Sequence, residues 1–149
     1  MPVTNNTLTL KFYNNVVDDL LLYAIILAKY ENKWIFCKHK LRSTYEVPGG
    51  KRHKGETMLD AAKRELHEET GASQFCIKPW LPYSVIECGI ESFGMIFYAD
   101  VNKLGPLPNH EMESIYLFDT LPDIKQWTYP TLQPAIIQKY IENQNLSDS

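Results

Sequence analysis

The chain has 149 residues and a net charge of −3, which favours a single domain and gives no basic footprint for binding bulk nucleic acid. Its three cysteines, Cys37, Cys76 and Cys88, include no CxxC pair, which argues against a disulfide framework or a zinc site and favours the reducing cytoplasm. The stretch Met1–Asn15 is mostly polar and lacks the basic start of a signal peptide. The apolar run Leu20–Ala28 is too short to span a bilayer, so we expect no membrane partner.

The first third of the chain predicts strands. The turn residues Glu31-Asn32-Lys33 separate two apolar runs and predict a hairpin, and Pro48-Gly49-Gly50 is expected to interrupt any regular element. We expect an edge strand at Leu8–Phe12, hairpin arms at Leu20–Lys29 and Trp34–Lys38, and a short extended segment at Ser43–Val47.

The clearest helix is Thr57–Thr70. Gly71 follows it directly, as a C-cap residue does. Leu59, Ala62 and Leu66 predict an apolar stripe that docks on the sheet.

The remainder of the chain predicts more strands and a second helix. Leu81-Pro82 is expected to separate two strands, and Pro134 falls within the first turns of the last helix. The expected strands are Phe75–Trp80, Tyr83–Cys88, Phe93–Val101 and Ser114–Phe118, and the expected helix is Pro130–Asn145. This order predicts a mixed α/β fold, with a curved sheet and helices on its faces. No repeat or linker is visible, so we expect one domain over residues 1–149.

Three carboxylates gather on the first helix. At about 100° per residue, Glu65, Glu68 and Glu69 fall on one face. Like charges at this spacing repel one another. A hard cation such as Mg²⁺ or Mn²⁺ reverses that sign, because carboxylate oxygens are its preferred ligands. The alternative is a solvated acidic helix face.

The flanking residues decide between these interpretations. The segment from position 50 to 72 fits the pattern G-x5-E-x7-R-E-U-x-E-E-x-G-U, in which U is aliphatic. Leu66 and Ala72 fill the aliphatic positions, Ala72 with a small side chain. The fixed positions are occupied by Gly50, Glu56, Arg64, Glu65, Glu68, Glu69 and Gly71. This pattern resembles the Nudix box, and the order of elements is compatible with the α/β/α sandwich of that family.

The resemblance implies hydrolysis of a diphosphate linkage in a nucleotide-like substrate, with Mg²⁺ or Mn²⁺. It implies that Glu68 and Glu69 are the principal metal ligands and that Glu65 is a further ligand or the base that activates water. The backbone carbonyl of Gly49 matches a position that often binds metal. Arg64 and Glu56 match an ion pair that locks the loop onto the helix.

Other residues are candidates for binding substrate or metal. Lys51 directly follows the glycines and is expected to contact phosphates, with Arg52 as the alternative, although a solvated turn is also compatible. Arg42 precedes the box and is a second phosphate candidate. Tyr45 is available to stack on a base. Many Nudix proteins use a downstream Glu, and here the candidates are Glu111 and Glu113, with Glu113 preferred because it immediately precedes a strand.

Size and layout resemble the MutT-type enzymes, so a nucleoside triphosphate is the expected substrate. Leu132 stands where the founding member has a base-reading Asn, which weakens an oxidised-guanine assignment, and Gln133 or Asn109 are the alternatives for that role. A catalytically inactive nucleotide-binding module on the same fold is the alternative function. We expect a small-molecule nucleotide as partner, and the resemblance leaves a homodimer open.

Overall fold

The computed structural model describes residues 8–108 and 111–147. Within them, seven strands form one mixed sheet in the order β1-β5-β6-β2-β3-β7, and β4 also pairs with β2. The β2–β6 pairing is parallel. The strands are β1 (Thr9–Phe12), β2 (Leu21–Tyr30), β3 (Lys33–His39), β4 (Gly49–Lys51), β5 (Ala72–Glu87), β6 (Ile90–Leu104) and β7 (Met112–Phe118).

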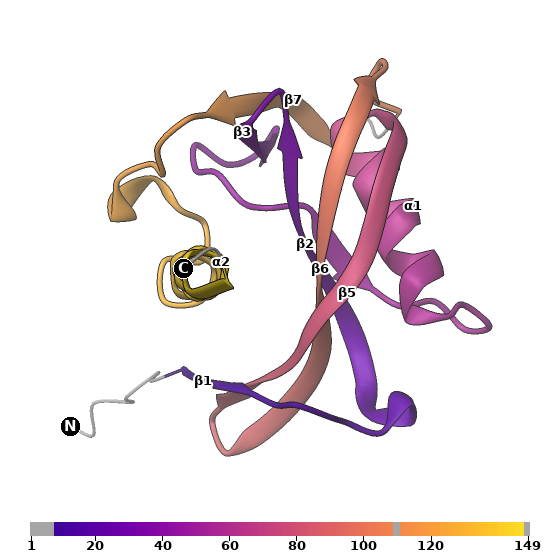
Figure 1. The fold of residues 1–149 in the computed structure, drawn as a ribbon, viewed down its shortest axis with the longest axis vertical. Coiled ribbons are helices and arrows are strands. Elements are labelled where there is room, and N and C mark those ends of the chain that lie inside the picture. The colour runs from indigo at the N-terminus through magenta and orange to yellow at the C-terminus, as the bar shows by residue number, and fades with distance from the viewer. Residues whose placement is uncertain (1–7, 109–110, 148–149) are drawn as a thin grey trace.

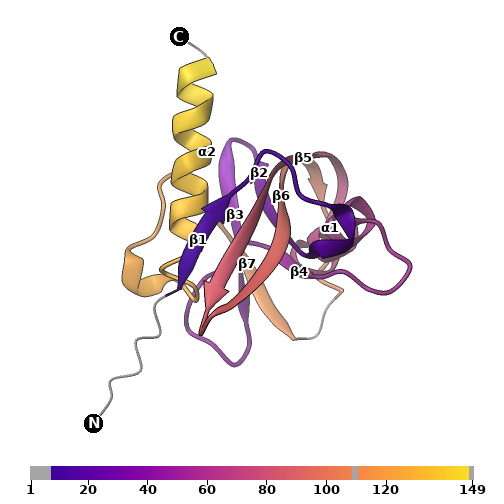
Figure 2. The ribbon, with the colours of Figure 1, turned by 90° about the horizontal axis from the view of Figure 1, so that it is seen from below.

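Two helices cover opposite faces of this sheet. Helix α1 spans Met58–Thr70 and helix α2 spans Gln133–Ser147. Both ribbon views place the sheet between them (Figure 1, Figure 2). Two short 3-10 helices, η1 (Asp18–Leu20) and η2 (Ile124–Gln126), lie in the connections. The predicted α/β/α sandwich with a mixed sheet is therefore confirmed.

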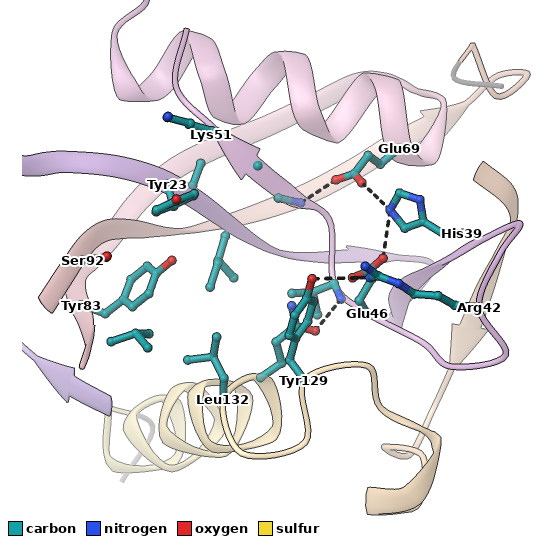
Figure 3. Close-up of a pocket in the computed structure, with 17 residues that line it drawn as sticks. Tyr23, His39, Arg42, Glu46, Lys51, Glu69, Tyr83, Ser92, Tyr129 and Leu132 are labelled. Carbon is teal, nitrogen blue, oxygen red and sulfur yellow. Dashed lines mark hydrogen bonds and ion pairs between the residues drawn. The ribbon is translucent and has the colours of Figure 1, made fainter. Parts of the chain in front are cut away.

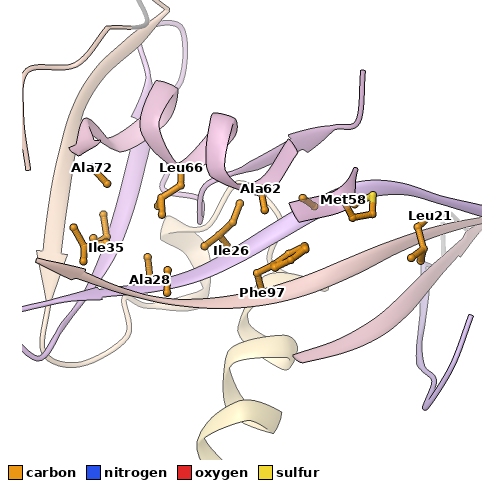
Figure 4. Close-up of a cluster of buried hydrophobic side chains, with 12 residues drawn as sticks. Leu21, Ile26, Ala28, Ile35, Met58, Ala62, Leu66, Ala72 and Phe97 are labelled. Atoms are coloured by element: carbon orange, nitrogen blue, oxygen red, sulfur yellow. The ribbon is translucent and has the colours of Figure 1, made fainter. Parts of the chain in front are cut away.

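Alternation along the strands builds two hydrophobic cores. In β2, Ala24 and Ile26 belong to the core beneath α1, whereas Ile25 and Leu27 belong to the core beneath α2. This is the two-residue period of a strand that is buried on both faces. Figure 4 shows the α1 side, where Leu66 packs among side chains of the sheet.

Helix α1 is fixed at both ends by its own sequence. The Thr57 hydroxyl accepts a hydrogen bond from the Asp60 N–H, and the Asp60 carboxylate accepts one from the Thr57 N–H. Gly71 ends the helix with φ of 78°, and its N–H donates to the His67 carbonyl. The predicted helix and its C-cap are thus confirmed.

The predicted apolar stripe of α1 is wrong at one position. Leu59 is exposed, whereas the buried apolar residues of the helix are Met58, Ala61, Ala62 and Leu66. The i, i+4 row from Met58 through Ala62 to Leu66 lies over the sheet, so Leu59 is turned to the side.

Two predicted interruptions are absent. β5 runs continuously through Leu81-Pro82, with a register shift between Pro79 and Leu81. β1 pairs only with Tyr83–Ile86, so Pro79 lies where β5 has no second neighbour and its missing N–H is tolerated. The glycines after Pro48 do not break the sheet either, because β4 pairs with β2.

The second helix starts later than predicted. Pro130 lies in the turn before α2, where the Tyr129 carbonyl accepts hydrogen bonds from the N–H groups of Leu132 and Gln133. Neither helix among the described residues is long and apolar enough to cross a membrane.

Candidate active site

A cavity of about 410 Å³ lies between the central sheet and the start of α2 (Figure 3). Glu69, Glu46, His39 and Arg42 line one end of it, and Tyr83 lines the other. Lys51 and Tyr23 lie towards α1, and Tyr129 and Leu132 project from the segment that opens α2. The cavity therefore joins a polar, charged end to a largely aromatic and aliphatic end.

Glu69 is the most enclosed carboxylate of α1. Its side chain is 9% exposed, and its Oε1 accepts a hydrogen bond of 2.7 Å from the N–H of Gly49. Burial and, to a smaller extent, the nearby carboxylates of Glu65, Glu46 and Glu68 raise the pKa of Glu69 to about 8, although the hydrogen bond from Gly49 opposes them. When like charges oppose the ionisation of a carboxyl group, a nearby cation stabilises its charged form.

Glu65 lies against the glycine strand. Its Oε1 accepts a 2.7 Å hydrogen bond from Arg64, and burial raises its pKa. A Cβ at Gly50 would stand 2.4 Å from the Glu65 carboxyl carbon, so only glycine lets this carboxylate approach the strand. Glu68, the third predicted ligand, is more exposed and lies 3.4 Å from Arg64.

Glu56 and Arg64 form the predicted ion pair. Arg64 Nε donates to Glu56 Oε2 at 2.8 Å, and Arg64 Nη2 donates to Glu56 Oε1 at 2.9 Å. The same guanidinium donates to the carbonyl of Lys51 in β4. Arg64, together with the N–H of His53, lowers the pKa of Glu56 to about 2. One arginine therefore ties the loop, the strand and the helix together.

These carboxylates have the chemistry that a divalent cation requires. Glu65, Glu68 and Glu69 offer oxygen donors, and the crowding that raises the pKa of Glu69 is relieved by positive charge. Within residues 8–108 and 111–147, no three acidic, histidine or cysteine side chains converge into a ready-made cage. Mg²⁺ does not need one, since it keeps waters and substrate phosphates among its ligands.

The candidate substrate-binding residues fall into two groups, those that line the cavity and one that does not. Lys51 and Arg42 line the cavity. Arg42 Nη1 lies 3.3 Å from Glu46 Oε2 and 3.5 Å from the Tyr129 hydroxyl. Tyr45 instead packs its ring edge-on against two aromatic rings of β7, with centroids 4.9 and 5.2 Å away. The structure therefore supports a position at the cavity wall for Lys51 and Arg42, but not for Tyr45.

The two downstream carboxylates have different settings, since Glu111 lines a neighbouring cavity with His39 and Arg42, whereas Glu113 is directed elsewhere. Glu113 forms an ion pair with Lys38. Lys38 alternates along β3 with Cys37 and His39, and His39 faces Glu69, so the Lys38–Glu113 pair is directed to the other face of the sheet. The carbonyl of Glu111 accepts a hydrogen bond from the Lys40 N–H. Asn109, an alternative for base reading, lies outside the described residues.

Two residues of the site were missed by sequence reasoning. Glu46 is buried in the cavity wall, and His39 Nε2 lies 3.1 Å from Glu46 Oε1 and 3.9 Å from Glu69 Oε2. The available signal was an acidic residue beside Val47 in a segment predicted to be extended, where an apolar residue is expected. Gln133 also lines the cavity, and its Oε1 accepts a 2.9 Å hydrogen bond from the Val47 N–H.

The sequence is similar both to a family model and to a protein of Bacillus subtilis. A family model described as the NUDIX domain matches residues 23–133. The chain is 32% identical over 119 residues to YtkD of Bacillus subtilis (strain 168), which is named as a candidate 8-oxo-dGTP diphosphatase, covering 79% of this chain and 75% of YtkD.

Solved structures agree with that match. A variant of the Bacillus subtilis pyrophosphohydrolase BsRppH is similar with a TM-score of 0.78 and 26% identity, covering 93% of this chain and 92% of that one. A Nudix hydrolase family member from Chromobacterium violaceum has a TM-score of 0.64 at 22% identity, covering 87% and 82%.

Proposed function

The chain belongs to the Nudix hydrolase family, and from that premise we propose that it hydrolyses a diphosphate linkage of a nucleoside triphosphate with Mg²⁺ or Mn²⁺. The observation that carries this proposal is the two-ended cavity. Glu69 and Arg42 lie at its charged end and Lys51 lies on the wall towards α1, which suits a polyphosphate and its cation. Its other end, with Tyr83 and Leu132, suits a nucleoside.

The carboxylates of α1, in and beside the cavity, have a distinct task in this proposal. Glu65, Glu68 and Glu69 would hold the cation, together with the carbonyl of Gly49. A bound divalent cation would neutralise the diphosphate oxygens and lower the pKa of water. Glu65 would also orient or deprotonate water, a role that its raised pKa supports because it moves towards the range of a general base.

Lys51 and Arg42 would bind the phosphates. Both lie on the cavity wall, and positive charge near the transferred group stabilises the charge that develops on it. The Glu56–Arg64 pair would act through geometry, because it fixes β4 and the loop against α1. Glu113, which pairs with Lys38, has no part in this proposal.

A substrate screen tests the proposal. Nucleoside triphosphates, including dGTP and 8-oxo-dGTP, should be compared with ADP-ribose and dinucleoside polyphosphates at saturating Mg²⁺. We expect turnover of at least one triphosphate and its loss in excess chelator, because the carboxylates depend on a cation. Full turnover in chelator would contradict the metal assignment. Binding without turnover of any compound would favour an inactive nucleotide-binding module.

A further inference from the structure

Glu46 is a buried carboxylate in the wall of the cavity, and neighbouring elements fix its backbone. Its N–H and carbonyl pair with Cys37 of β3, at 3.0 and 2.8 Å. The N–H of the next residue, Val47, is held by Gln133 from α2. The side chain is only 7% exposed. Both strand and helix therefore hold this acid at one place in the site.

The Glu46 carboxylate is poorly satisfied by ordinary hydrogen bonds. Oε2 accepts one long bond of 3.3 Å from Arg42. Oε1 is buried and receives no aligned hydrogen bond from the described residues, although His39 Nε2 lies 3.1 Å away. Leaving a buried carboxylate in this condition is costly, and an apolar residue would fill the position at lower cost. We therefore expect the acid to orient the basic side chains beside it, Arg42 and His39.

Arg42 shows how Glu46 can orient a basic side chain. Its side chain is 45% exposed and would be free to move. Glu46 holds it from one side, while the Tyr129 hydroxyl lies 3.5 Å from Nη1 and the Tyr129 ring lies 5.9 Å from the guanidinium carbon. Both hydrogen bonds use Nη1, so among residues 8–108 and 111–147 the rest of the fork stays available for a second acceptor.

We infer that Glu46 is a positioning residue for phosphate binding, which holds the guanidinium of Arg42 and the imidazole of His39 on the cavity wall beside Glu69. This inference rests on the proposed function. It makes a prediction opposite to simple electrostatics. A negative charge near the phosphates should weaken their binding, so its removal by Glu46→Gln should lower KM if the charge acts directly. If Glu46 acts by holding the basic groups, the same change should raise KM.

Steady-state kinetics of four variants test the inference. Glu46→Gln, Arg42→Ala, the double variant and Glu142→Gln are compared on the triphosphate found in the screen, at saturating Mg²⁺. Glu142 lies on α2 and accepts a hydrogen bond from Gln138, so it serves as the matched carboxylate-to-amide control. We expect Glu46→Gln to raise KM by about 5–10-fold with kcat within about twofold, the signature of lost uniform binding. Among the described residues the carboxylate accepts an aligned hydrogen bond from Arg42 but none from His39, so most of its effect should pass through Arg42, and the double variant should show the KM of Arg42→Ala with little further change.

The opposing outcomes are equally definite. A KM for Glu46→Gln that equals or falls below that of the parent would overturn the inference, and so would KM effects that multiply in the double variant. If Glu46→Gln does not fold, Arg42→Lys should reproduce the rise in KM, because an ammonium lacks the fork that Glu46 orients. An Arg42→Lys KM equal to the parent's would then overturn it.

The proposed function could fail separately, if the parent turned over none of the compounds. Calorimetry with inorganic triphosphate and Mg²⁺ then decides the inference. A Kd raised about 5–10-fold in Glu46→Gln would sustain it, and an unchanged Kd would refute it.

Discussion

Two glutamates near the ends of α1 have opposite electrostatic settings. Glu56, just before the helix, accepts two hydrogen bonds from Arg64 and one from the His53 N–H, and its pKa falls to about 2. Glu69, in the last turn, accepts one hydrogen bond from Gly49, is buried, and has its pKa raised to about 8. The same side chain is therefore stabilised as an anion at one end and opposed as an anion at the other.

The difference separates support from function within one motif. A carboxylate whose partners are all supplied by the chain, like Glu56, contributes to the fold without any ligand. A carboxylate that is buried and crowded by other carboxylates, like Glu69, resists ionisation unless a bound cation stabilises its charge. Substitution of Glu69 should therefore mainly lower the catalytic rate, whereas substitution of Glu56 should mainly lower the stability of the fold.

The largest expected effect is on the rate of Glu69→Gln. The amide keeps an oxygen for the N–H of Gly49 but removes the negative charge. If Glu69 binds the cation, kcat should fall by about 10²-fold or more, since several kcal/mol of charge stabilisation pass through the metal. The melting temperature should hold or rise because a repelling charge has left. The measurement is kcat at saturating Mg²⁺ beside a thermal melt.

Glu56→Gln is the matched substitution at the glutamate that Arg64 stabilises as an anion. It removes the charge that Arg64 holds, so the melting temperature should fall. A parent-like kcat in folded Glu69→Gln would show that Glu69 does not bind the cation that catalysis requires. Equal effects of the two substitutions on rate and on melting would erase the distinction between them.

A smaller effect is expected for Arg64→Ala. Arg64 contacts Glu56, Glu65 and the carbonyl of Lys51, so its loss should let β4 and the carboxylates drift. We expect kcat/KM to fall by about tenfold or more while the chain still unfolds cooperatively, because small displacements at a reacting centre are costly. Arg64→Lys should recover little, since an ammonium cannot reproduce the two-pronged contact with Glu56. A kcat/KM unchanged in both variants would show that the pair does not support catalysis.

The helix and its carboxylates could be predicted because their signals are local. The spacing of the box, the Thr57 cap and the Gly71 C-cap all lie within one stretch of chain, and the structure follows them. The hairpin of β2 and β3 was predictable for the same reason, since its turn residues adjoin both arms.

The rest depends on partners that are distant in sequence. The continuity of β5 through its prolines depends on where β1 stops pairing, which no local pattern reports. The direction of Glu113 follows from the register of β7 on β3. Glu46 is placed by its pairing with Cys37 and by the bond from the N–H of its neighbour Val47 to Gln133, 86 residues after Val47, so an acidic residue in a short extended segment gave little indication of its setting.

The smallest expected effect concerns stability and pH in the absence of metal. An unfolded Glu has a pKa of about 4.3, whereas the pKa of folded Glu69 is about 8. Between these values the folded chain holds a proton that the unfolded chain has released, so the free energy of unfolding falls as the pH rises. At about 1.4 kcal/mol for each unit of pKa difference, and with allowance for relaxation around a buried group, we expect a loss on the order of 1–3 kcal/mol from pH 5 to pH 8.

Denaturant unfolding in chelator, with the parent and Glu69→Gln side by side, measures this loss. The Gln variant cannot titrate at that position, so its free energy of unfolding should change less over the same range, and the parent should lose stability relative to the variant as the pH rises. Adding Mg²⁺ should stabilise the parent more at pH 8 than at pH 6, because at pH 6 the cation must first displace the proton from Glu69. The gain should be much reduced in Glu69→Gln at both pH values. Parallel curves for the two proteins in chelator would mean that Glu69 is already ionised at neutral pH, and its contrast with Glu56 would then be one of position alone.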